Sequence, residues 1–408
     1  MDSLIFLKEI ILIKSERKGY GGRPQHSVQG ARPILYYSIY NNILFQRFTL
    51  KFRYLCANLY MYSFKEQLFV NFKESKILFK TLTSQKITNF FKVYSSFIYS
   101  RKTKKGNHWG FPISLGIEPT NYCNLRCPEC PSGLRAFTRP TGMLQKELFQ
   151  KLIDELHPYL IYLILYFQGE PYLHPDFFEL VNYATKKNIF TATSTNAHYL
   201  TPENAERTVQ SGLKRLIISI DGTTQETYQS YRVGGSLKKV IEGTQNIIEA
   251  KHRLQSETPF VIFQFLVVKP NEHQIPEIFE LGKKLKVDKV ALKTAQIYDY
   301  QNGNPLIPEQ AQFSRYQKKP DGTYSIKNKL ENQCWKLWSG AEITWDGRVV
   351  PCCFDKNAKY QMGVFPEQSF QEIWNNPKYL NFRIQLLNGR KNIDICTNCT
   401  EGTKVWET

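Results

Sequence analysis

The feature that most constrains the fold is an alternation of short apolar runs with longer helix-like stretches, which begins near Pro112. The apolar runs predict strands over residues 113–117, 162–167, 190–194, 216–220, 260–267 and 289–292. The stretches between them predict helices over residues 145–156, 175–187, 202–211, 236–250 and 275–285. Six strands linked by five helices indicate a parallel sheet with right-handed crossovers, hence an α/β fold that is doubly wound or a partial barrel. No GxGxxG follows any strand, which disfavours a dinucleotide-binding fold.

A cysteine-rich loop follows the first predicted strand. In the sequence NYCNLRCPECP, Cys123, Cys127 and Cys130 are separated by three and then two residues. Soft thiolate ligands so close together favour a metal ion or an iron–sulfur cluster. Structural zinc sites need four ligands, commonly as two separated pairs, and this loop has no fourth Cys or His. Ligands of parallel α/β folds bind at the carboxyl ends of strands, so the loop lies where chemistry is expected.

A second group of cysteines lies near the C-terminus. Its members are Cys334, Cys352, Cys353, Cys396 and Cys399. Residues 346–347, an Asp-Gly pair between two β-rich runs, predict a tight hairpin that returns Cys352 toward Cys334. The terminal CxxC pair can then close a four-thiolate cage. Such a cage suits either an iron–sulfur cluster or zinc.

The CxxxCxxC loop resembles the signature of the radical S-adenosylmethionine (SAM) enzymes, in which three cysteines hold a 4Fe–4S cluster and the open iron binds SAM. The second group resembles the SPASM or twitch domain appended to many of these enzymes. In the SPASM pattern four residues separate a glycine from the ligand cysteine. Counted from Gly347, this spacing implies that Cys352 is a ligand and that Cys353 is not. The resemblance covers residues 110–402 and implies one SAM-binding and one auxiliary 4Fe–4S cluster. The implied cluster ligands are Cys123, Cys127, Cys130, Cys334, Cys352, Cys396 and Cys399.

Further matches to this family follow successive strands. QGEP, residues 168–171, resembles the loop that receives the SAM amino group, because an ammonium needs acceptors such as a carboxylate or carbonyls. STNA, residues 194–197, resembles the ribose-binding segment, and SIDG with Arg232 resembles the SAM-carboxylate site, for which a guanidinium fork is suitable. The residues that the resemblance assigns to SAM are Gln168, Gly169, Glu170, Ser194, Asn196, Ser219 and Arg232.

Each of these short motifs also has a structural interpretation. QGEP can be a Gly-Pro turn, Ser194 or Asn196 can cap a helix or form a turn, and Arg232 can be a surface residue. Three further residues are candidates to face the substrate. For each of them, a structural role or a position next to SAM is expected first. They are Asp221, Gln264 and Lys293.

The positive charge is concentrated in an N-terminal extension. Residues 1–108 contain 19 Lys or Arg and 5 Asp or Glu, a net charge of +14 out of +18 for the chain. Lys and Arg beside Tyr and Phe suit contact with an anionic membrane surface. The alternative is a helical segment that packs on the barrel, because the apolar residues do not form one clean face. A cytoplasmic protein is expected, since no signal peptide, no membrane-spanning stretch and no disulfide scaffold is evident.

The sequence thus predicts an N-terminal extension over residues 1–108, a partial (β/α)6 barrel over 109–300, a linker over 301–333 and a cluster domain over 334–408 that closes the open side. The resemblance implies reductive cleavage of SAM to a 5′-deoxyadenosyl radical, which abstracts hydrogen from a peptide or carbohydrate-like substrate, with the auxiliary cluster assisting oxidation or binding substrate. A flavodoxin or ferredoxin is the implied electron donor. The alternative is a zinc-binding scaffold or nucleic-acid protein, although no RNA-binding signature is present and no nucleic-acid partner is expected.

Overall fold

The computed structural model describes residues 72–327 and 329–400. Two helices come first, α3 (Phe72–Lys80) and α4 (Ser84–Thr103). No helix in these described ranges is both long and apolar enough to cross a membrane. Most of the N-terminal extension, for which membrane-surface contact was one interpretation, lies outside the described residues.

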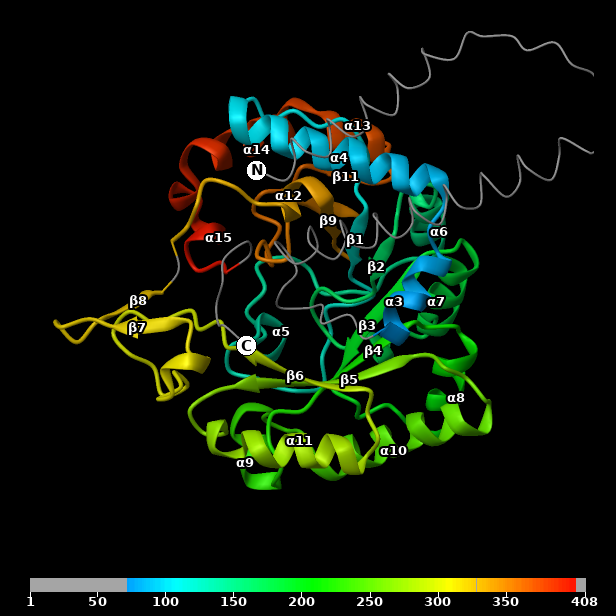
Figure 1. The fold of residues 1–408 in the computed structure, drawn as a ribbon, viewed down its shortest axis with the longest axis vertical. Helices are drawn as coiled ribbons and strands as arrows, with labels where there is room; N and C mark the ends of the chain where they lie inside the picture. Colours follow the sequence, from blue (N-terminus) through cyan, green and yellow to red (C-terminus); the bar gives the residue numbers. More distant parts are fainter. Residues whose placement is uncertain (1–71, 328, 401–408) are drawn as a thin grey trace, which may run out of the picture. The chain divides into compact units, whose positions relative to one another are not determined.

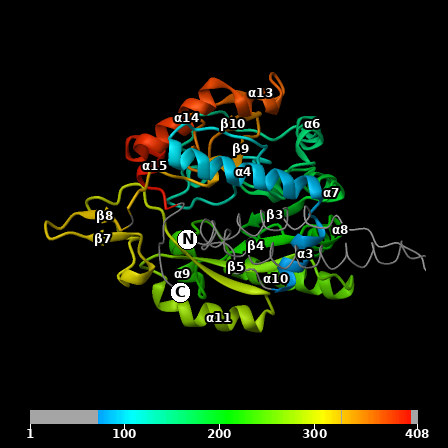
Figure 2. The ribbon, with the colours of Figure 1, turned by 45° about the horizontal axis from the view of Figure 1, so that its top comes forward.

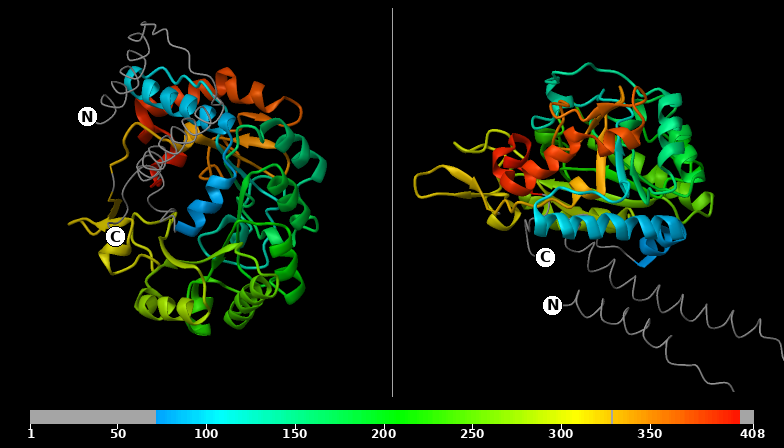
Figure 3. Two further views of the ribbon diagram at one scale, coloured as in Figure 1. Left: turned by 45° about the vertical axis from the view of Figure 1, so that its right-hand side comes forward. Right: turned by 90° about the horizontal axis from the view of Figure 1, so that it is seen from above.

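A curved parallel sheet forms the core of the chain (Figures 1 and 2). Its first six strands follow chain order and are β1 (Ser114–Ile117), β2 (Tyr162–Ile164), β3 (Phe190–Thr195), β4 (Arg215–Ser219), β5 (Phe260–Val267) and β6 (Lys289–Thr294). The helices that link them are α6 (Lys146–Leu156), α7 (Phe177–Lys186), α8 (Pro202–Gln210), α9 (Gln225–Tyr231), α10 (Leu237–Arg253) and α11 (Ile275–Lys284). They lie around the outside of the sheet (Figure 3, left). Each buries one face, as α6 does with Phe149, Leu152, Ile153 and Leu156.

This architecture confirms the predicted partial barrel. The six strands and five of the linking helices occur where the alternation of apolar runs placed them, most within two residues. The exception among the strands is β2, which was expected to reach Phe167 but ends at Ile164. The short helix α9 was not expected, because residues 225–231 contain few apolar residues.

The C-terminal residues extend the same sheet. Strand β9 (Gly340–Ile343) pairs in parallel with β1, and β10 (Arg348–Val350) and β11 (Gly363–Val364) follow in antiparallel order. The sheet therefore runs from β11 through β1 to β6, and its two edges do not pair with each other in the described chain. The remaining elements are α5 (Pro131–Leu134), α12 (Lys336–Ser339), α13 (Phe370–Asn375), α14 (Pro377–Gly389) and α15 (Asp394–Thr397).

Gly347 forms the predicted hairpin between β9 and β10. Its φ of +82° lies in the left-handed region, and a Cβ at this position would lie 2.1 Å from the carbonyl oxygen of Phe365. Both constraints favour glycine at this turn. Residues 301–333, expected to be a linker, contain a second hairpin of β7 (Tyr316–Lys318) and β8 (Tyr324–Ile326), which projects from the sheet (Figure 1).

Helix α3 covers the amino ends of the strands, opposite the cysteine loop. Glu74 forms a buried ion pair with Arg215, the first residue of β4, and Ile77 packs against Tyr162 and Phe190, the first residues of β2 and β3. Helix α4 instead packs against α12, where Phe97 contacts Trp335 edge to face with ring centroids 5.3 Å apart. Residues 72–103 thus favour the interpretation as a helical segment that packs on the barrel.

Candidate active site

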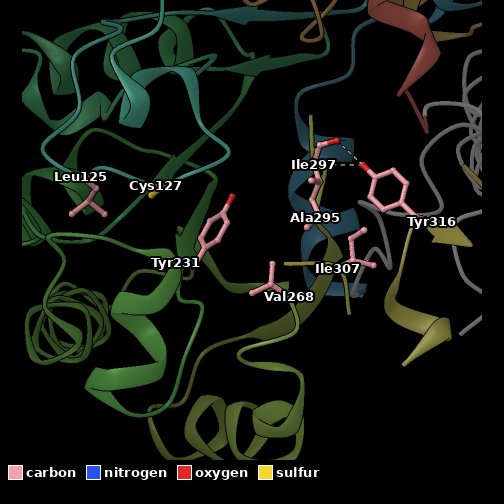
Figure 4. Close-up of a cluster of buried hydrophobic side chains, with 8 residues drawn as sticks. All are labelled: Leu125, Cys127, Tyr231, Val268, Ala295, Ile297, Ile307 and Tyr316. Atoms are coloured by element: carbon pink, nitrogen blue, oxygen red, sulfur yellow. Dashed lines mark hydrogen bonds between the residues drawn. The ribbon is translucent and has the colours of Figure 1, made fainter. Parts of the chain in front are cut away.

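The three cysteines of the first loop share one environment at the carboxyl ends of the strands. Cys127 is buried within a cluster, here called the barrel-mouth cluster, against which Cys123 and Cys130 also pack (Figure 4). Its members are Leu125, Cys127, Tyr231, Val268, Ala295, Ile297, Ile307 and Tyr316. Burial raises the pKa of the Cys123 thiol to about 12, and the nearby Glu170, Cys130 and Cys127 add to the rise. The Cys123 thiol therefore stays protonated near neutral pH unless a metal centre binds it, which is how metal sites couple ligand deprotonation to binding.

The QGEP loop is hydrogen-bonded to the cysteine loop. The Glu170 amide donates to the Tyr122 carbonyl oxygen at 2.7 Å, and the Gly169 amide donates to Ser132 Oγ at 2.9 Å. Gly169 has a φ of +76°, and a Cβ there would lie 2.3 Å from the Thr120 carbonyl oxygen. The side chain of Gln168, where the family pattern has glycine, donates to the carbonyl oxygen of Phe167 at 2.8 Å. The backbone of the QGEP loop therefore lies directly against the backbone of the cysteine loop.

Glu170 is buried and joins this loop to the end of β3. Its Oε1 accepts from Thr195 Oγ1 at 2.8 Å and from the Tyr172 amide at 3.2 Å, and its Oε2 accepts from the Asn196 amide at 2.7 Å. Burial raises the pKa of Glu170 to about 7, although these hydrogen bonds oppose the rise. A cation close to a buried carboxyl group stabilises its ionised form, so a bound ammonium group would lower this pKa.

The raised pKa of Glu170 predicts a pH-dependent stability. Between the ordinary pKa of a glutamate and about 7, the folded metal-free protein binds a proton that the unfolded chain has lost, so the free energy of unfolding falls as pH rises through this window. Glu170→Gln removes this dependence. Relative to wild type, the variant should gain roughly 3 kcal/mol of unfolding free energy between pH 5 and pH 8.

Urea denaturation at several pH values tests this prediction. Glu203→Gln, at an exposed position in α8, is the matched control and should follow wild type at every pH. Parallel curves for wild type and Glu170→Gln would show that the carboxyl group is ionised across the range.

The polar residues at the ends of β3 and β4 lie beside the cysteine loop. Asn196 Nδ2 donates to Asn124 Oδ1 at 2.8 Å and lies 4.0 Å from Cys123 Sγ. Ser194 Oγ and Ser219 Oγ are 3.5 Å apart on neighbouring strands. The predicted positions are thus brought together at the same edge of the sheet.

Arg232 also reaches the cysteine loop. Its Nη1 lies 3.9 Å from Cys127 Sγ, and its Nε donates to Asp221 Oδ2. Asp221 is fully buried and also accepts from the Leu266 amide at 2.7 Å. Asp221 therefore contacts both Arg232 and the end of β5. Whether it also faces the substrate stays a prediction. Gln264 and Lys293 are half-buried on β5 and β6.

The second cysteine group encloses a cavity. Cys334, Cys352, Cys396 and Cys399 all line it, together with the cationic side chains of Lys336 and Arg390. Cys353 does not line the cavity. Its sulfur accepts from Lys336 Nζ at 3.0 Å and packs against a separate apolar group around Phe167.

Two family models match the chain over the parts that carry these sites. Residues 117–282 match the radical SAM superfamily, and residues 334–400 match SPASM, an iron-sulfur cluster-binding domain. The chain belongs to the radical SAM superfamily. The first match contains the three-cysteine loop and the second contains the later cysteines, so the family prediction is confirmed, as are the predicted cofactor classes, iron–sulfur clusters and SAM. Which residues bind these cofactors remains a prediction.

Several known proteins are similar to this radical SAM chain. An AdoMet-dependent heme synthase of Methanosarcina barkeri is 27% identical over 299 residues, 65% of this chain and 82% of the relative. A PqqA peptide cyclase of Gluconobacter oxydans is 25% identical over 299 residues, 67% of this chain and 79% of the relative.

Among solved structures, Streptococcus suis SuiB bound to S-adenosylmethionine has a TM-score of 0.55 at 16% identity, covering 74% of this chain and 75% of SuiB. SuiB bound to precursor peptide SuiA has a TM-score of 0.52 at 17% identity, covering 69% of each chain. At this identity the likeness shows the fold alone.

The four cysteines that line the cavity suit either zinc or a 4Fe–4S cluster by their chemistry. Residues 334–400 match an iron-sulfur cluster-binding domain, which favours the cluster over the zinc alternative.

The cavity predicts different outcomes for the adjacent cysteines. Cys352→Ala should lower the iron content after anaerobic reconstitution from about eight to about four per chain, because one cluster loses a ligand. Cys353→Ala is the matched control and should keep all the iron. Iron and acid-labile sulfide assays measure both, and equal loss in both variants would contradict the assignment of Cys352.

Sequence reasoning missed the charged residues that surround these sites. Lys336 and Arg390 line the auxiliary cavity, and a buried Glu118–Arg139 pair lies beneath the cysteine loop. None belongs to a motif, and isolated charged residues resemble ordinary surface positions in a sequence. For Glu118 the sequence contained one indication of a functional position, because this residue directly follows a predicted buried strand and precedes the cysteine loop.

Proposed function

We propose that this chain is a SAM-cleaving radical enzyme that abstracts hydrogen from a peptide substrate. The observation that carries the proposal is the convergence of four predicted segments at one edge of the sheet: the cysteine loop, the QGEP loop, the end of β3 and Arg232. When bound, a 4Fe–4S cluster and SAM supply reductive cleavage of the sulfonium to methionine and a 5′-deoxyadenosyl radical.

The residues of this edge have separate roles in the proposal. Cys123, Cys127 and Cys130 hold the cluster, Glu170 with the Gln168 and Gly169 carbonyls receives the SAM amino group, and Arg232 receives its carboxylate. Ser194, Asn196 and Ser219 provide hydroxyl and amide groups for the ribose. Because Asp221 binds Arg232 Nε, Nη1 of the guanidinium remains beside the cysteine loop, 3.9 Å from Cys127 Sγ.

The auxiliary site supports an oxidative net reaction. The four cysteines that line one cavity provide a ligand for every iron of a 4Fe–4S cluster, which leaves no iron open for substrate. Arg390 lines the same cavity, and positive charge near a cluster raises its reduction potential. Lys336 lines the cavity as well but is paired with Glu342 at 3.3 Å. We therefore assign this cluster the role of accepting the electron that remains on the substrate.

Peptides are the favoured substrate class over carbohydrates. The relative from Gluconobacter oxydans is a peptide cyclase, and SuiB was solved with a precursor peptide. A small electron carrier such as flavodoxin or ferredoxin is the proposed donor, because the reaction consumes one electron per SAM cleaved.

Anaerobic reconstitution tests the proposed function. The protein should take up about eight irons per chain and, with dithionite and SAM, release 5′-deoxyadenosine and methionine in equal amounts. Zinc without iron, or iron without cleavage of SAM, would contradict the proposal. Mass spectrometry of candidate peptides then tests the substrate class through the loss of two hydrogens.

A further inference from the structure

Helix α4 and the segment after it carry an exposed pair of aromatic side chains. The helix buries Phe97 against Trp338 of α12, and Tyr99, two residues later, lies on the opposite face of the helix. Tyr99 is 38% and Trp109 48% exposed, which are high values for large aromatic side chains. Their rings contact each other, with centroids 5.3 Å apart. Tyr and Trp combine an apolar ring with a polar group, and they concentrate at membrane–water interfaces.

Four cationic residues lie between the two aromatic residues in the sequence. All four are exposed, and they are Arg101, Lys102, Lys104 and Lys105. Lys102 follows Tyr99 by three residues in α4, so these two side chains are neighbours on one face of the helix. This surface, here called the tip patch, consists of Tyr99, Arg101, Lys102, Lys104, Lys105 and Trp109. Aromatic and cationic side chains therefore occur together at the end of α4.

The segment after α4 is attached to two other helices. Trp338 Nε1, in α12, donates to the carbonyl oxygen of Asn107 at 2.9 Å. A Cβ on Gly106 would lie 2.9 Å from Ile384 Cγ1, so the segment lies against α14. Leu380, one turn before Ile384 in that helix, is 38% exposed. The tip patch therefore has a defined position on the protein, and exposed apolar surface continues beside it on α14.

Positive charge predominates in the two segments that form this region. Residues 75–117 contain eight Lys or Arg, and residues 373–393, which include α14, contain four, whereas neither segment contains Asp or Glu. The acidic residues that border the two segments each have a partner in the described chain, although two of them, Glu372 and Asp394, are exposed. They are Glu74, Glu118, Glu155, Glu372 and Asp394. The region therefore attracts an anionic surface.

We infer that the tip patch binds the surface of a membrane that contains anionic lipids. The aromatic pair lies among the lipid headgroups, and the lysine side chains direct their ammonium groups to the lipid phosphates. Each Lys or Arg near an anionic membrane strengthens binding about fivefold, so four cations together contribute on the order of 500-fold. The contact is peripheral and sensitive to salt, because the attraction acts over about 8 Å at physiological ionic strength. It does not depend on the proposed radical chemistry.

A nucleic acid is the other anionic partner that cations and aromatic rings attract. Bases stack on open ring faces, whereas Tyr99 and Trp109 contact each other. The exposed Leu380 beside the patch adds an aliphatic side chain, which suits acyl chains and makes no contact with phosphates. These two observations favour the membrane.

Co-sedimentation of the full-length protein with lipid vesicles tests the inference. The protein should bind vesicles of phosphatidylcholine mixed with phosphatidylglycerol, should not bind phosphatidylcholine alone, and should dissociate as salt is added. Lys102→Glu/Lys105→Glu should weaken the partition into anionic vesicles about 100-fold at low ionic strength, because two cations become two anions. Lys283→Glu/Lys284→Glu is the matched control, with the same charge change at exposed positions in the last turn of α11, on the opposite side of the barrel (Figure 1). It should stay within a few-fold of wild type.

Brominated lipids test the aromatic contact separately. Anionic vesicles with bromine atoms on their acyl chains should quench the tryptophan fluorescence of wild type, and most of this quenching should be absent from Trp109→Phe. The exposed position of Trp109 means that this variant keeps the wild-type stability toward urea. Equal quenching in the two proteins would show that Trp109 does not lie at the membrane, and would overturn the inference.

Three results of the vesicle experiment would also overturn it. If wild type ignores anionic vesicles, the patch has another role. If Lys283→Glu/Lys284→Glu weakens binding as much as Lys102→Glu/Lys105→Glu, the total charge of the protein attracts the vesicles and the tip patch is not the contact. If a single-stranded RNA oligonucleotide binds wild type, loses binding in Lys102→Glu/Lys105→Glu and competes with the vesicles at low occupancy, the patch belongs to a nucleic acid.

Discussion

Replacing Cys123 by alanine should reduce the release of 5′-deoxyadenosine to background, even with dithionite as the reductant. The three thiols of this loop are the proposed ligands of one 4Fe–4S cluster, and a cluster that loses one of three ligands is not retained in a form with a single open iron. Cys123 also lies beside a proposed SAM residue, with its sulfur 4.0 Å from Asn196 Nδ2. Iron content should fall by about half, because the auxiliary site keeps its own four cysteines.

Cys353→Ala is the matched control for this experiment. Cys353 is also a half-buried cysteine, but it lies outside the first loop and outside the auxiliary cavity. The control should retain both iron and cleavage of SAM. If the Cys123→Ala variant cleaved SAM at the wild-type rate, the reactive cluster would lie elsewhere. Loss of all iron from this variant would show that the two cluster sites are filled together.

Local patterns predicted the barrel strands but not the way in which the sheet is extended. Strand β5, Phe260–Val267, is an apolar run interrupted by Gln264 and was predicted with its observed limits, because a strand buried on both faces leaves a nearly continuous apolar pattern. The Asp-Gly turn before β10 was equally readable. The pairing of β9 with β1 was not, since it joins residues more than 200 positions apart and parallel pairing leaves no turn signal in the sequence.

The site shows the same division between local and distant information. The cysteine loop and QGEP were readable because each is a contiguous motif. In the structure the amides of QGEP donate to the Tyr122 carbonyl oxygen and to the Ser132 hydroxyl, which brings the two segments together. The partners of Asp221 could not be predicted, because Arg232 and the amide of Leu266 come close to it only in the folded sheet. Arg139 looked like one more basic residue, although it is buried in an ion pair with Glu118.

The Glu118–Arg139 pair joins three parts of the chain beneath the cysteine loop. Glu118 follows β1, and Arg139 follows the loop itself. Arg139 donates from both Nη atoms to the two carboxylate oxygens at 2.7 and 2.6 Å, and from Nε to the carbonyl oxygen of Lys356 at 2.7 Å. The Trp345 amide, in the hairpin of the SPASM part, donates to Glu118 Oε2 at 3.2 Å. The side chains of the pair are 1% and 0% exposed.

Arg139→Met should therefore lower the free energy of unfolding by about 3–5 kcal/mol, because it leaves a buried carboxylate without its partner. Urea denaturation followed by tryptophan fluorescence measures the loss. Arg253→Met is the matched control, since the Arg253–Glu206 pair is 60% and 38% exposed and its removal should cost at most about 1 kcal/mol. Glu118→Gln/Arg139→Met should recover part of the loss, because the remaining side chain is neutral. A single Arg139 variant as stable as the control would mean that water or another group already compensates Glu118, and that the pair does not hold the SPASM hairpin against the first cysteine loop.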